Sequence, residues 1–269
     1  MTAYVIQGGK AGKERLNLLA QLMLPTTSDL FSRVGVNGGM KCLDVGCGGG
    51  HVTLLLADMV GAEGHVVGTD MDADVLALAQ EDATAAGANH VEFRQVDAAT
   101  DPEEAAYDLV YARFLLTHLK DPEQCLTTMV KACKPEGLIV VEDIDFTGSF
   151  CHPPNPAYER YTSLYQQVVH RRGGDPNIGP KLPGMLRGAG LDEVRVNVVQ
   201  PTHIDEDGKV FAAVTMDRIA GSVISEGLAT QHEVAEIIGK LNAAAADPDT
   251  VMSIPRVFQS WGRRPAIAR

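Results

Sequence analysis

Positive charge is scarce in this 269-residue chain, which has 23 lysines and arginines against 35 aspartates and glutamates, and a formal net charge of −12. Surfaces that bind nucleic acid or an anionic membrane broadly carry an excess of basic residues. The composition therefore predicts neither kind of partner. A small-molecule partner is the default expectation for such an acidic chain.

Cysteine is also scarce, and long apolar runs are absent. The five cysteines, an odd number without a Cys-x-x-Cys pair, favour free thiols over a disulfide framework or a structural zinc site. No stretch approaches the roughly 18 apolar residues of a membrane span. The opening segment MTAYVIQGGKAGKERL lacks the apolar core of a signal peptide. We expect a soluble, cytoplasmic protein.

The segment Lys41–Gly50, KCLDVGCGGG, is the most informative part of the chain. Its apolar start predicts a short buried strand, its glycines allow a sharp turn close to a ligand, and a helical pattern begins at His51. Strand, glycine loop and helix in this order form the nucleotide site of open α/β sheets. A Gly-x-Gly-x-x-Gly frame laid on Gly46 fails at His51, which disfavours a nicotinamide-dependent oxidoreductase.

From Asp44 the glycines follow at alternate positions, and LDVGCGGG resembles motif I of the class I S-adenosylmethionine (SAM) dependent methyltransferases. The leader that ends in Glu-Arg-Leu resembles the ubiquinone/menaquinone-methyltransferase-like group. This resemblance implies SAM as the cofactor and S-adenosylhomocysteine as its product. It places the following residues of this part of the chain at the cofactor: Tyr4, Arg15, Asp44, Gly46, Cys47 and Gly48. Arg15 would pair with the methionyl carboxylate of SAM, or it is a solvated arginine on a helix face.

Acidic residues end the next two predicted strands. The strand HVVGTD ends in Asp70, about 20 positions beyond the glycine loop, and its two carboxylate oxygens match the two ribose hydroxyls. Met71 would then pack against adenine, and Asp72 is expected to be a helix N-cap. The strand VEFRQVD ends in Asp97. The resemblance implies that Asp97 binds the adenine amino group, while the Ala98 amide binds a ring nitrogen.

Three further candidates follow the predicted fourth strand, 107–112, where the resemblance places the methyl-transfer site: Arg113, Phe114 and His118. His118 is the candidate general base, because a neutral imidazole accepts a proton near physiological pH. Alternatively, His118 orders the loop or packs against the methionyl end of the cofactor. Arg113 either orients an anionic acceptor or stabilises the loop.

The alternation of predicted elements indicates an α/β fold: a doubly wound, mostly parallel sheet of seven strands, with helical cap insertions after strands five and six. A helix at 14–25, ended by Pro25, and a shorter helix at 28–34 precede the sheet. The last strand is expected to be antiparallel to the sixth. The predicted division is a helical cover at 1–35, the SAM-binding core at 36–145, 181–201 and 251–269, and cap insertions at 146–180 and 202–250.

Nothing in the two insertions names an acceptor. They leave the sheet at the edge that carries the glycine loop, so they are expected to cover the cofactor. Most of their basic residues are expected at a solvated surface: His152, His170, Arg171, Arg172 and His203. Acids end the fifth strand at Glu142, Asp143 and Asp145, but the fourth strand offers Arg113 rather than an acid. We therefore predict no metal.

The sequence as a whole predicts a SAM-dependent methyltransferase that acts on an O, N or C nucleophile of a small molecule by in-line displacement. The alternative is a protein of the same fold that uses bound SAM without methyl transfer, as a pericyclase-like enzyme or a ligand-binding protein. A pure interaction module fits less well, given the number of cofactor-type positions. The apolar faces of the cap helices are compatible with a homodimer.

Overall fold

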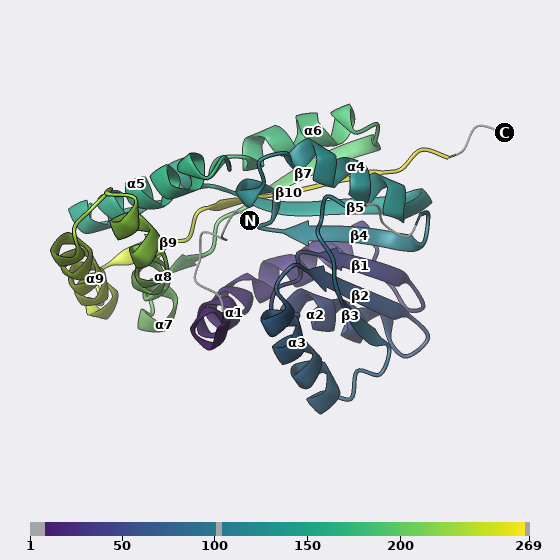
Figure 1. The fold of residues 1–269 in the computed structure, drawn as a ribbon, viewed down its shortest axis with the longest axis horizontal. Coiled ribbons are helices and arrows are strands. Elements are labelled where there is room, and N and C mark those ends of the chain that lie inside the picture. The colour runs from purple at the N-terminus through teal and green to yellow at the C-terminus, as the bar shows by residue number, and fades with distance from the viewer. Residues whose placement is uncertain (1–8, 101–103, 267–269) are drawn as a thin grey trace.

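The computed structural model describes residues 9–100 and 104–266, and Figure 1 shows the arrangement of its helices and strands. Five parallel strands and an antiparallel pair form one sheet, in the order β3-β2-β1-β4-β5-β10-β7. These strands are β1 (Lys41–Val45), β2 (His65–Asp70), β3 (Val91–Gln95), β4 (Tyr107–Arg113), β5 (Cys133–Asp145), β7 (Asp192–Val199) and β10 (Arg256–Arg263). The predicted seven-stranded, mostly parallel sheet is confirmed, including the last strand antiparallel to the sixth.

Both faces of the sheet are covered because alternate side chains of each strand point to opposite sides. In β4, Val110 and Ala112 join a core with residues of α4 (Pro122–Ala132) and α6 (Leu182–Gly188). Leu109 and Tyr111 face the other way and pack with residues of α1 (Gly9–Val34) and α2 (His51–Val60). Another helix, α3 (Ala73–Ala85), connects β2 to β3. The sheet is therefore doubly wound, as predicted.

Helix α1 corrects the prediction that Pro25 ends a helix. The helix runs through Pro25 to Val34. Proline removes one backbone hydrogen bond, so continuation needs support from elsewhere. That support is tertiary: Met23 is fully buried, and the Thr27 hydroxyl donates to the buried Glu142 carboxylate at 2.8 Å. Anchors on both sides of Pro25 thus keep the two halves in one helix.

The predicted helix cap at Asp72 is present, and a second aspartate caps another helix. The Asp72 side chain accepts from the backbone N–H of Asp74 and Val75, at 3.0 and 3.2 Å, and starts α3. Asp121 accepts from the Gln124 N–H at 2.9 Å and starts α4. Each satisfies helix N–H groups that have no partner within the helix. The predicted third strand was too long, since β3 ends two residues before Asp97.

The two insertions form a helical cap at one end of the sheet, on the left in Figure 1. Its helices are α5 (Pro156–Arg171), α7 (Glu206–Lys209), α8 (Phe211–Ser225) and α9 (Gln231–Ala246). A small sheet that the sequence did not predict joins β6 (Cys151–His152), β9 (Val251–Ser253) and β8 (Thr202–His203). Short 3₁₀ turns lie at Leu116–His118, Phe146–Gly148 and Gly179–Lys181.

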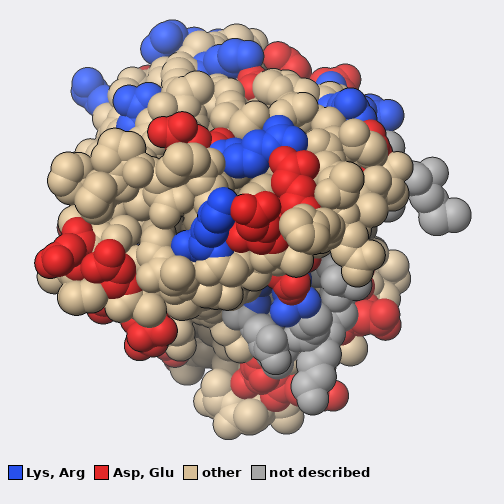
Figure 2. All heavy atoms as spheres, turned by 90° about the vertical axis from the view of Figure 1, so that its left-hand side faces the viewer, with Lys and Arg blue, Asp and Glu red and all other residues tan. Residues whose placement is uncertain are grey.

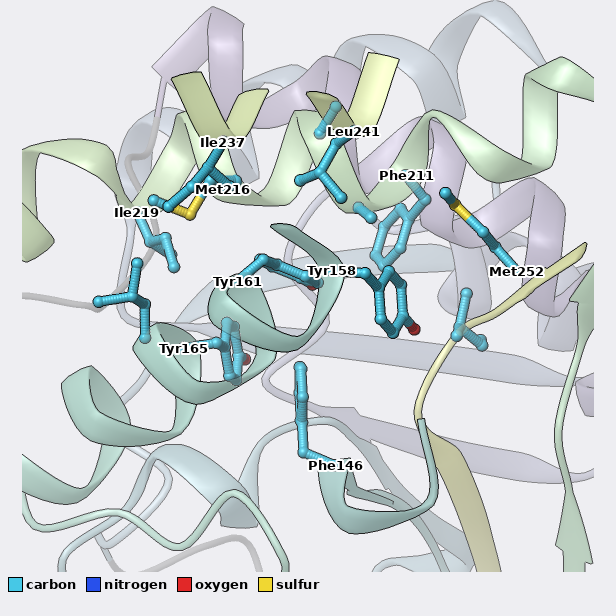
Figure 3. Packing of buried hydrophobic residues seen from close by; sticks show 14 of the residues in the cluster. Phe146, Tyr158, Tyr161, Tyr165, Phe211, Met216, Ile219, Ile237, Leu241 and Met252 are labelled. Atoms are coloured by element: carbon cyan, nitrogen blue, oxygen red, sulfur yellow. The ribbon is translucent and has the colours of Figure 1, made fainter. Parts of the chain in front are cut away.

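The cap has its own hydrophobic core, which continues to the cavity described below. Figure 3 shows Tyr158, Tyr161 and Tyr165 along α5, with Phe146 beneath Tyr165. The rings of Phe146 and Tyr165 are stacked with centroids 4.1 Å apart. Leu19 and Met23 of α1 belong to the same core. The cap is therefore packed against the N-terminal helix as well as within itself.

Charges of both signs are interspersed on the cap side of the molecule, as Figure 2 shows for the face that lies to the left in Figure 1. Some are paired between helices, as Arg160 of α5 is with Glu233 of α9 at 2.8 Å. Within residues 9–100 and 104–266, no helix is both long and apolar enough to cross a membrane.

Candidate active site

A cavity of about 600 Å³ lies where the carboxyl ends of the parallel strands meet the cap. Its wall includes most of the residues that the sequence placed at the cofactor: Arg15, Asp44, Gly46, Cys47, Gly48, Asp70, Met71, Asp97, Ala98, Arg113, Phe114 and His118. Tyr4 lies outside the described residues. Three aspartates from the ends of neighbouring strands thus line one hollow, as the motif order predicts.

The glycine loop after β1 has no room for side chains at two positions. Gly46 has a φ of +69°, and a Cβ there would lie 2.9 Å from the Leu115 side chain. Gly50 has a φ of +76°, and its Cβ would lie 2.8 Å from the Phe93 ring. Both φ values favour glycine, and both positions are closely packed. The loop therefore brings bare backbone to the cavity wall.

Asp70 fixes this loop from the end of β2. One carboxylate oxygen accepts from the Gly48 N–H at 2.9 Å, and the other accepts from the Asp72 N–H at 3.0 Å. A carboxylate oxygen has two lone pairs, so each oxygen can accept a second bond from a ligand. The Asp70 carboxylate is therefore oriented in advance and still able to bind a diol.

Asp44 lies deeper, with 2% of its surface exposed. Burial raises its pKa to about 6, although a hydrogen bond from the Thr53 hydroxyl at 2.7 Å and the charge of Arg113 oppose that shift. A cationic group in the cavity would favour the ionised form. The neighbouring Cys47 thiol also has a raised pKa, chiefly because it is buried, and stays protonated near neutral pH.

Asp97 and Ala98 follow β3 and line the cavity as well. One Asp97 oxygen accepts from the Ala99 N–H at 2.9 Å, which leaves the second oxygen of the carboxylate for a ligand. Met71, which follows Asp70 in the chain, also lines the cavity. It is 63% exposed and offers a large apolar surface. This edge can hold a flat polar ring.

Arg15 is buried, with 7% of its surface exposed. Its Nε donates to the Thr215 hydroxyl at 3.2 Å, and its guanidinium lies 5.1 Å from the centre of the Phe211 ring. Both partners belong to α8, so of the two alternatives given for Arg15, the solvated helix-face arginine is wrong. A buried guanidinium in an apolar wall is a strong site for an anion.

His118 ends the 3₁₀ turn after β4. Burial is the main reason that its pKa is lowered to about 3, and the charges of Arg15 and Arg172 add to the effect. The turn is held by Asp143, which accepts from the Thr117 N–H at 3.0 Å and whose own burial raises its pKa to about 7. The imidazole is therefore neutral at physiological pH, on a turn that Asp143 holds.

Arg113 is part of a buried network that sequence reasoning did not find. Its Nη1 donates to the Thr27 hydroxyl at 3.2 Å, and Thr27 donates to Glu142. Glu142 also accepts from Gln259 at 2.7 Å and from the Tyr111 hydroxyl. Only the tertiary fold brings these residues together. The network connects the cavity wall to α1 and to the last strand.

The cap contributes wall residues that sequence reasoning missed: Phe146, Tyr161, Tyr165, Arg172, Phe211 and Thr215. Arg172 corrects the expectation of a solvated position, since its side chain is only 22% exposed and lines the cavity. The spacing of residues along α5 could have indicated this position of Arg172. Tyr158, Tyr161, Tyr165 and Arg172 follow helical spacing, so they share one side of α5 and its end.

The carboxylates of β5 have protein partners. Glu142 belongs to the network above, Asp143 holds the His118 turn, and Asp145 pairs with Arg256 at 2.6 Å. In the described part of the chain, no group of three or more His, Cys, Asp or Glu side chains is arranged to hold a metal ion.

Comparison with known proteins identifies the family. A family model described as a methyltransferase domain matches residues 36–171, half of the chain. The chain belongs to the methyltransferase-domain family. Its fold is that of the class I SAM-dependent methyltransferases, so the resemblance drawn from the sequence is confirmed, and SAM is the cofactor of this family.

Individual relatives show which members of the family are similar. Phosphoethanolamine N-methyltransferase 1 of Arabidopsis thaliana is 28% identical over 173 residues, which are 64% of this chain and 32% of the relative. Demethylmenaquinone methyltransferase of Shouchella clausii is 34% identical over 113 residues, 42% of this chain and 48% of the relative. The match thus spans about a third of the plant protein and half of the bacterial one.

A solved structure shows the fold over nearly the whole chain. It is that of a candidate methyltransferase from Bacillus halodurans, with a TM-score of 0.62 and 21% sequence identity. The alignment covers 89% of this chain and 98% of that one. The shared architecture therefore includes the cap region as well as the sheet.

Proposed function

We propose that this chain transfers the methyl group of SAM to a small-molecule acceptor. The observation that carries the proposal is that Asp44, Asp70 and Asp97 end adjacent strand segments and line one cavity beneath a cap. A surface that binds only another protein would not need three carboxylates converging on one enclosed hollow.

The wall residues match the chemical groups of SAM. In the proposal, the Asp70 carboxylate binds the ribose hydroxyls, and the Asp97 carboxylate with the Ala98 N–H binds the adenine edge. Asp44 provides a negative charge for the methionyl amine, and Arg15 a positive one for the methionyl carboxylate. The glycine loop at Gly46–Gly48 would lie along the methionyl group and offer it bare backbone, since Gly46 and Gly48 line the cavity.

When bound, SAM supplies a methyl group activated by its sulfonium charge. The protein's own contribution is orientation and the exclusion of water by α1, α5 and α8. Orientation alone is worth about 7–11 kcal/mol in favourable intramolecular reactions. The aromatic cap residues around the cavity provide the apolar surroundings that such positioning needs.

His118 remains our candidate catalytic group beside the acceptor. With a pKa of about 3 it is a weak base in the surroundings that the structure shows. An acceptor with a negative charge next to the imidazole would raise that pKa. His118 can therefore accept a hydrogen bond from the acceptor, and its strength as a base depends on which acceptor is bound.

A direct test uses binding and turnover together. Calorimetry should show that S-adenosylhomocysteine binds one molecule per chain, and a thermal-shift assay should show stabilisation by S-adenosylhomocysteine but not by NAD. Incubation with methyl-labelled SAM and a set of acceptors should release S-adenosylhomocysteine and label the acceptor. Binding without any release would favour the alternative, a protein of this fold that uses SAM without methyl transfer.

Location and assembly are also part of the proposal. The five cysteines all lie within the described residues and are free thiols, which suits a reducing cytoplasm. We propose no nucleic-acid or membrane partner. A homodimer would use exposed apolar residues of the cap such as Ile204 and Ile224, and sedimentation would detect it.

A further inference from the structure

Two arginines on the cap side of the cavity are held by the same face of one helix. Arg15 donates to the Thr215 hydroxyl at 3.2 Å, and Arg172 donates to the Ser222 hydroxyl at 2.8 Å. Thr215 and Ser222 are seven residues apart in α8, so they lie on one face about 10 Å from each other along the axis. Helix α8 thus positions both guanidinium groups at the cavity.

The charge of Arg15 is not balanced by a protein carboxylate. Among the side chains that the structure describes, 15–100 and 104–266, no Asp or Glu forms an ion pair with Arg15, although only 7% of its surface is exposed. A buried charge needs a counter-ion to offset the cost of its desolvation. Arg172 has a partner, Glu226 at 3.3 Å, but its guanidinium carries five N–H donors and can serve a ligand as well.

The turn that carries His118 lies against the end of α5, where Arg172 is. The Thr117 hydroxyl donates to the Asp175 carbonyl at 2.8 Å, and the Asp175 N–H donates to the Thr117 carbonyl at 2.9 Å. The charges of Arg15 and Arg172 both contribute to the low pKa of His118, after burial. Arg15, His118 and Arg172 thus form an electropositive end of the cavity, called the cationic end below.

The carboxylates of the cavity wall lie on one side of it, and the cap contributes aromatic rings to the other. The acidic wall residues come from the sheet side: Asp44, Asp70, Asp72, Asp97 and Asp121. The described cap residues in the wall include no carboxylate, and several are aromatic: Phe146, Tyr161, Tyr165 and Phe211. Phe146 and Tyr165 are stacked on each other and both line the cavity, so they form part of its apolar wall. A cationic acceptor would find no counter-charge on this side.

We propose that the acceptor is an aromatic acid, whose ring lies against the aromatic cap residues and whose carboxylate or ionised phenol is anchored at the cationic end. The inference rests on the proposed function, because it assumes that SAM fills the sheet side of the cavity. Arg15 then neutralises the methionyl carboxylate, and Arg172, which also pairs with Glu226, donates hydrogen bonds to the acceptor's anion. Neutral and cationic acceptors of the same shape bind less tightly.

The test compares three probes of similar size on the protein saturated with S-adenosylhomocysteine: salicylate, the neutral salicylamide and the cationic benzylamine. Calorimetry should show that salicylate binds at least about tenfold more tightly than the other two. The variant Arg172→Gln should lose about tenfold in salicylate affinity and keep its affinity for S-adenosylhomocysteine. Arg171→Gln is the matched control, since Arg171 is exposed, donates to the Glu226 carbonyl and is not among the described residues that line the cavity.

The outcomes separate the two proposals. If S-adenosylhomocysteine does not bind the wild-type protein, the proposed function fails. If it binds, but salicylate binds no better than salicylamide or benzylamine, or not at all at millimolar concentration, the acceptor class is wrong. Equal losses of salicylate affinity in Arg172→Gln and Arg171→Gln would likewise overturn the proposed acceptor class. Should Arg172→Gln not fold, the three-probe comparison on the wild-type protein decides the question, and Arg172→Lys, which keeps the charge, should keep the preference for salicylate.

Discussion

Identical side chains behave differently in this site because their surroundings differ. Asp44 and Asp143 are both buried and have raised pKa values of about 6 and about 7, whereas Asp70 orients the glycine loop from a half-buried position. The sequence identifies Asp44 and Asp70 by their place at strand ends. The sequence cannot show that Asp143 turns inward to hold the His118 turn, because that depends on how the turn packs against β5.

Asp143 should make stability depend on pH. Its pKa is raised from 3.8 to about 7 in the folded protein, so folding favours its protonated form. That contribution is complete at low pH and is lost as the pH rises from about 4 to about 7. Asp143→Asn removes this pH-dependent contribution. The difference in free energy of unfolding, wild type minus variant, should therefore fall by about 1 kcal/mol for each pH unit between about 4 and 7. Urea denaturation of both proteins at several pH values measures the difference.

The variant also loses one hydrogen bond, either from the Thr117 N–H or from the Ile144 N–H, which is a cost independent of pH. Only the slope of the free energy of unfolding against pH therefore tests the environment of Asp143. Parallel stability curves for the wild type and Asp143→Asn would contradict the assigned environment of this carboxyl.

Two glycines should respond in opposite ways to replacement by alanine. Gly50→Ala places a Cβ 2.8 Å from the Phe93 ring at a φ of +76°, and it should destabilise the protein by more than about 1 kcal/mol and weaken S-adenosylhomocysteine binding. Gly239→Ala lies within α9 with open space around it and should stabilise the protein by up to about 1 kcal/mol. Thermal unfolding measures both, and a harmless Gly50→Ala would show that the loop is not packed as described.

At the scale of elements, the sequence predicts most of what local rules control. Short apolar runs give β1, β2 and β4, and the capping acids Asp72 and Asp121 give the starts of α3 and α4. Errors occur where tertiary contacts override local preference. Pro25 does not end α1, and the short strands β6, β8 and β9 pair only because the cap folds back on itself.

The Glu142 network should be essential for the packing of α1 on the sheet. Glu142 is fully buried and accepts hydrogen bonds from Thr27, Gln259 and Tyr111. Glu142→Ala leaves these three donors without their acceptor and should destabilise the protein by about 3 kcal/mol or more. Guanidinium chloride denaturation measures the change. The matched control is Glu236→Ala, whose carboxylate is exposed and pairs only with Lys240 at the surface, and it should change stability little. Equal effects would contradict the role given to the network.

At the scale of the whole molecule, the site lies between the sheet and the cap, which contribute different kinds of side chain. The sheet brings carboxylates and bare backbone, and the cap brings aromatic rings and Arg172. The sheet side could be predicted from the sequence because its motifs are local and their order fixes which strand ends meet. The cap side could not, because the position of Arg172 or Thr215 depends on how two insertions, far apart in the chain, pack together.

The most direct test of this account is the affinity of Asp70→Ala for S-adenosylhomocysteine, measured by calorimetry beside Asp58→Ala, whose side chain is exposed on α2. Asp70 holds the glycine loop and, in the proposal, also binds the ribose. Its loss should lower the affinity by about 100-fold or more while the circular dichroism spectrum stays that of the wild type, and Asp58→Ala should bind as the wild type does. Unchanged affinity in Asp70→Ala would contradict the account.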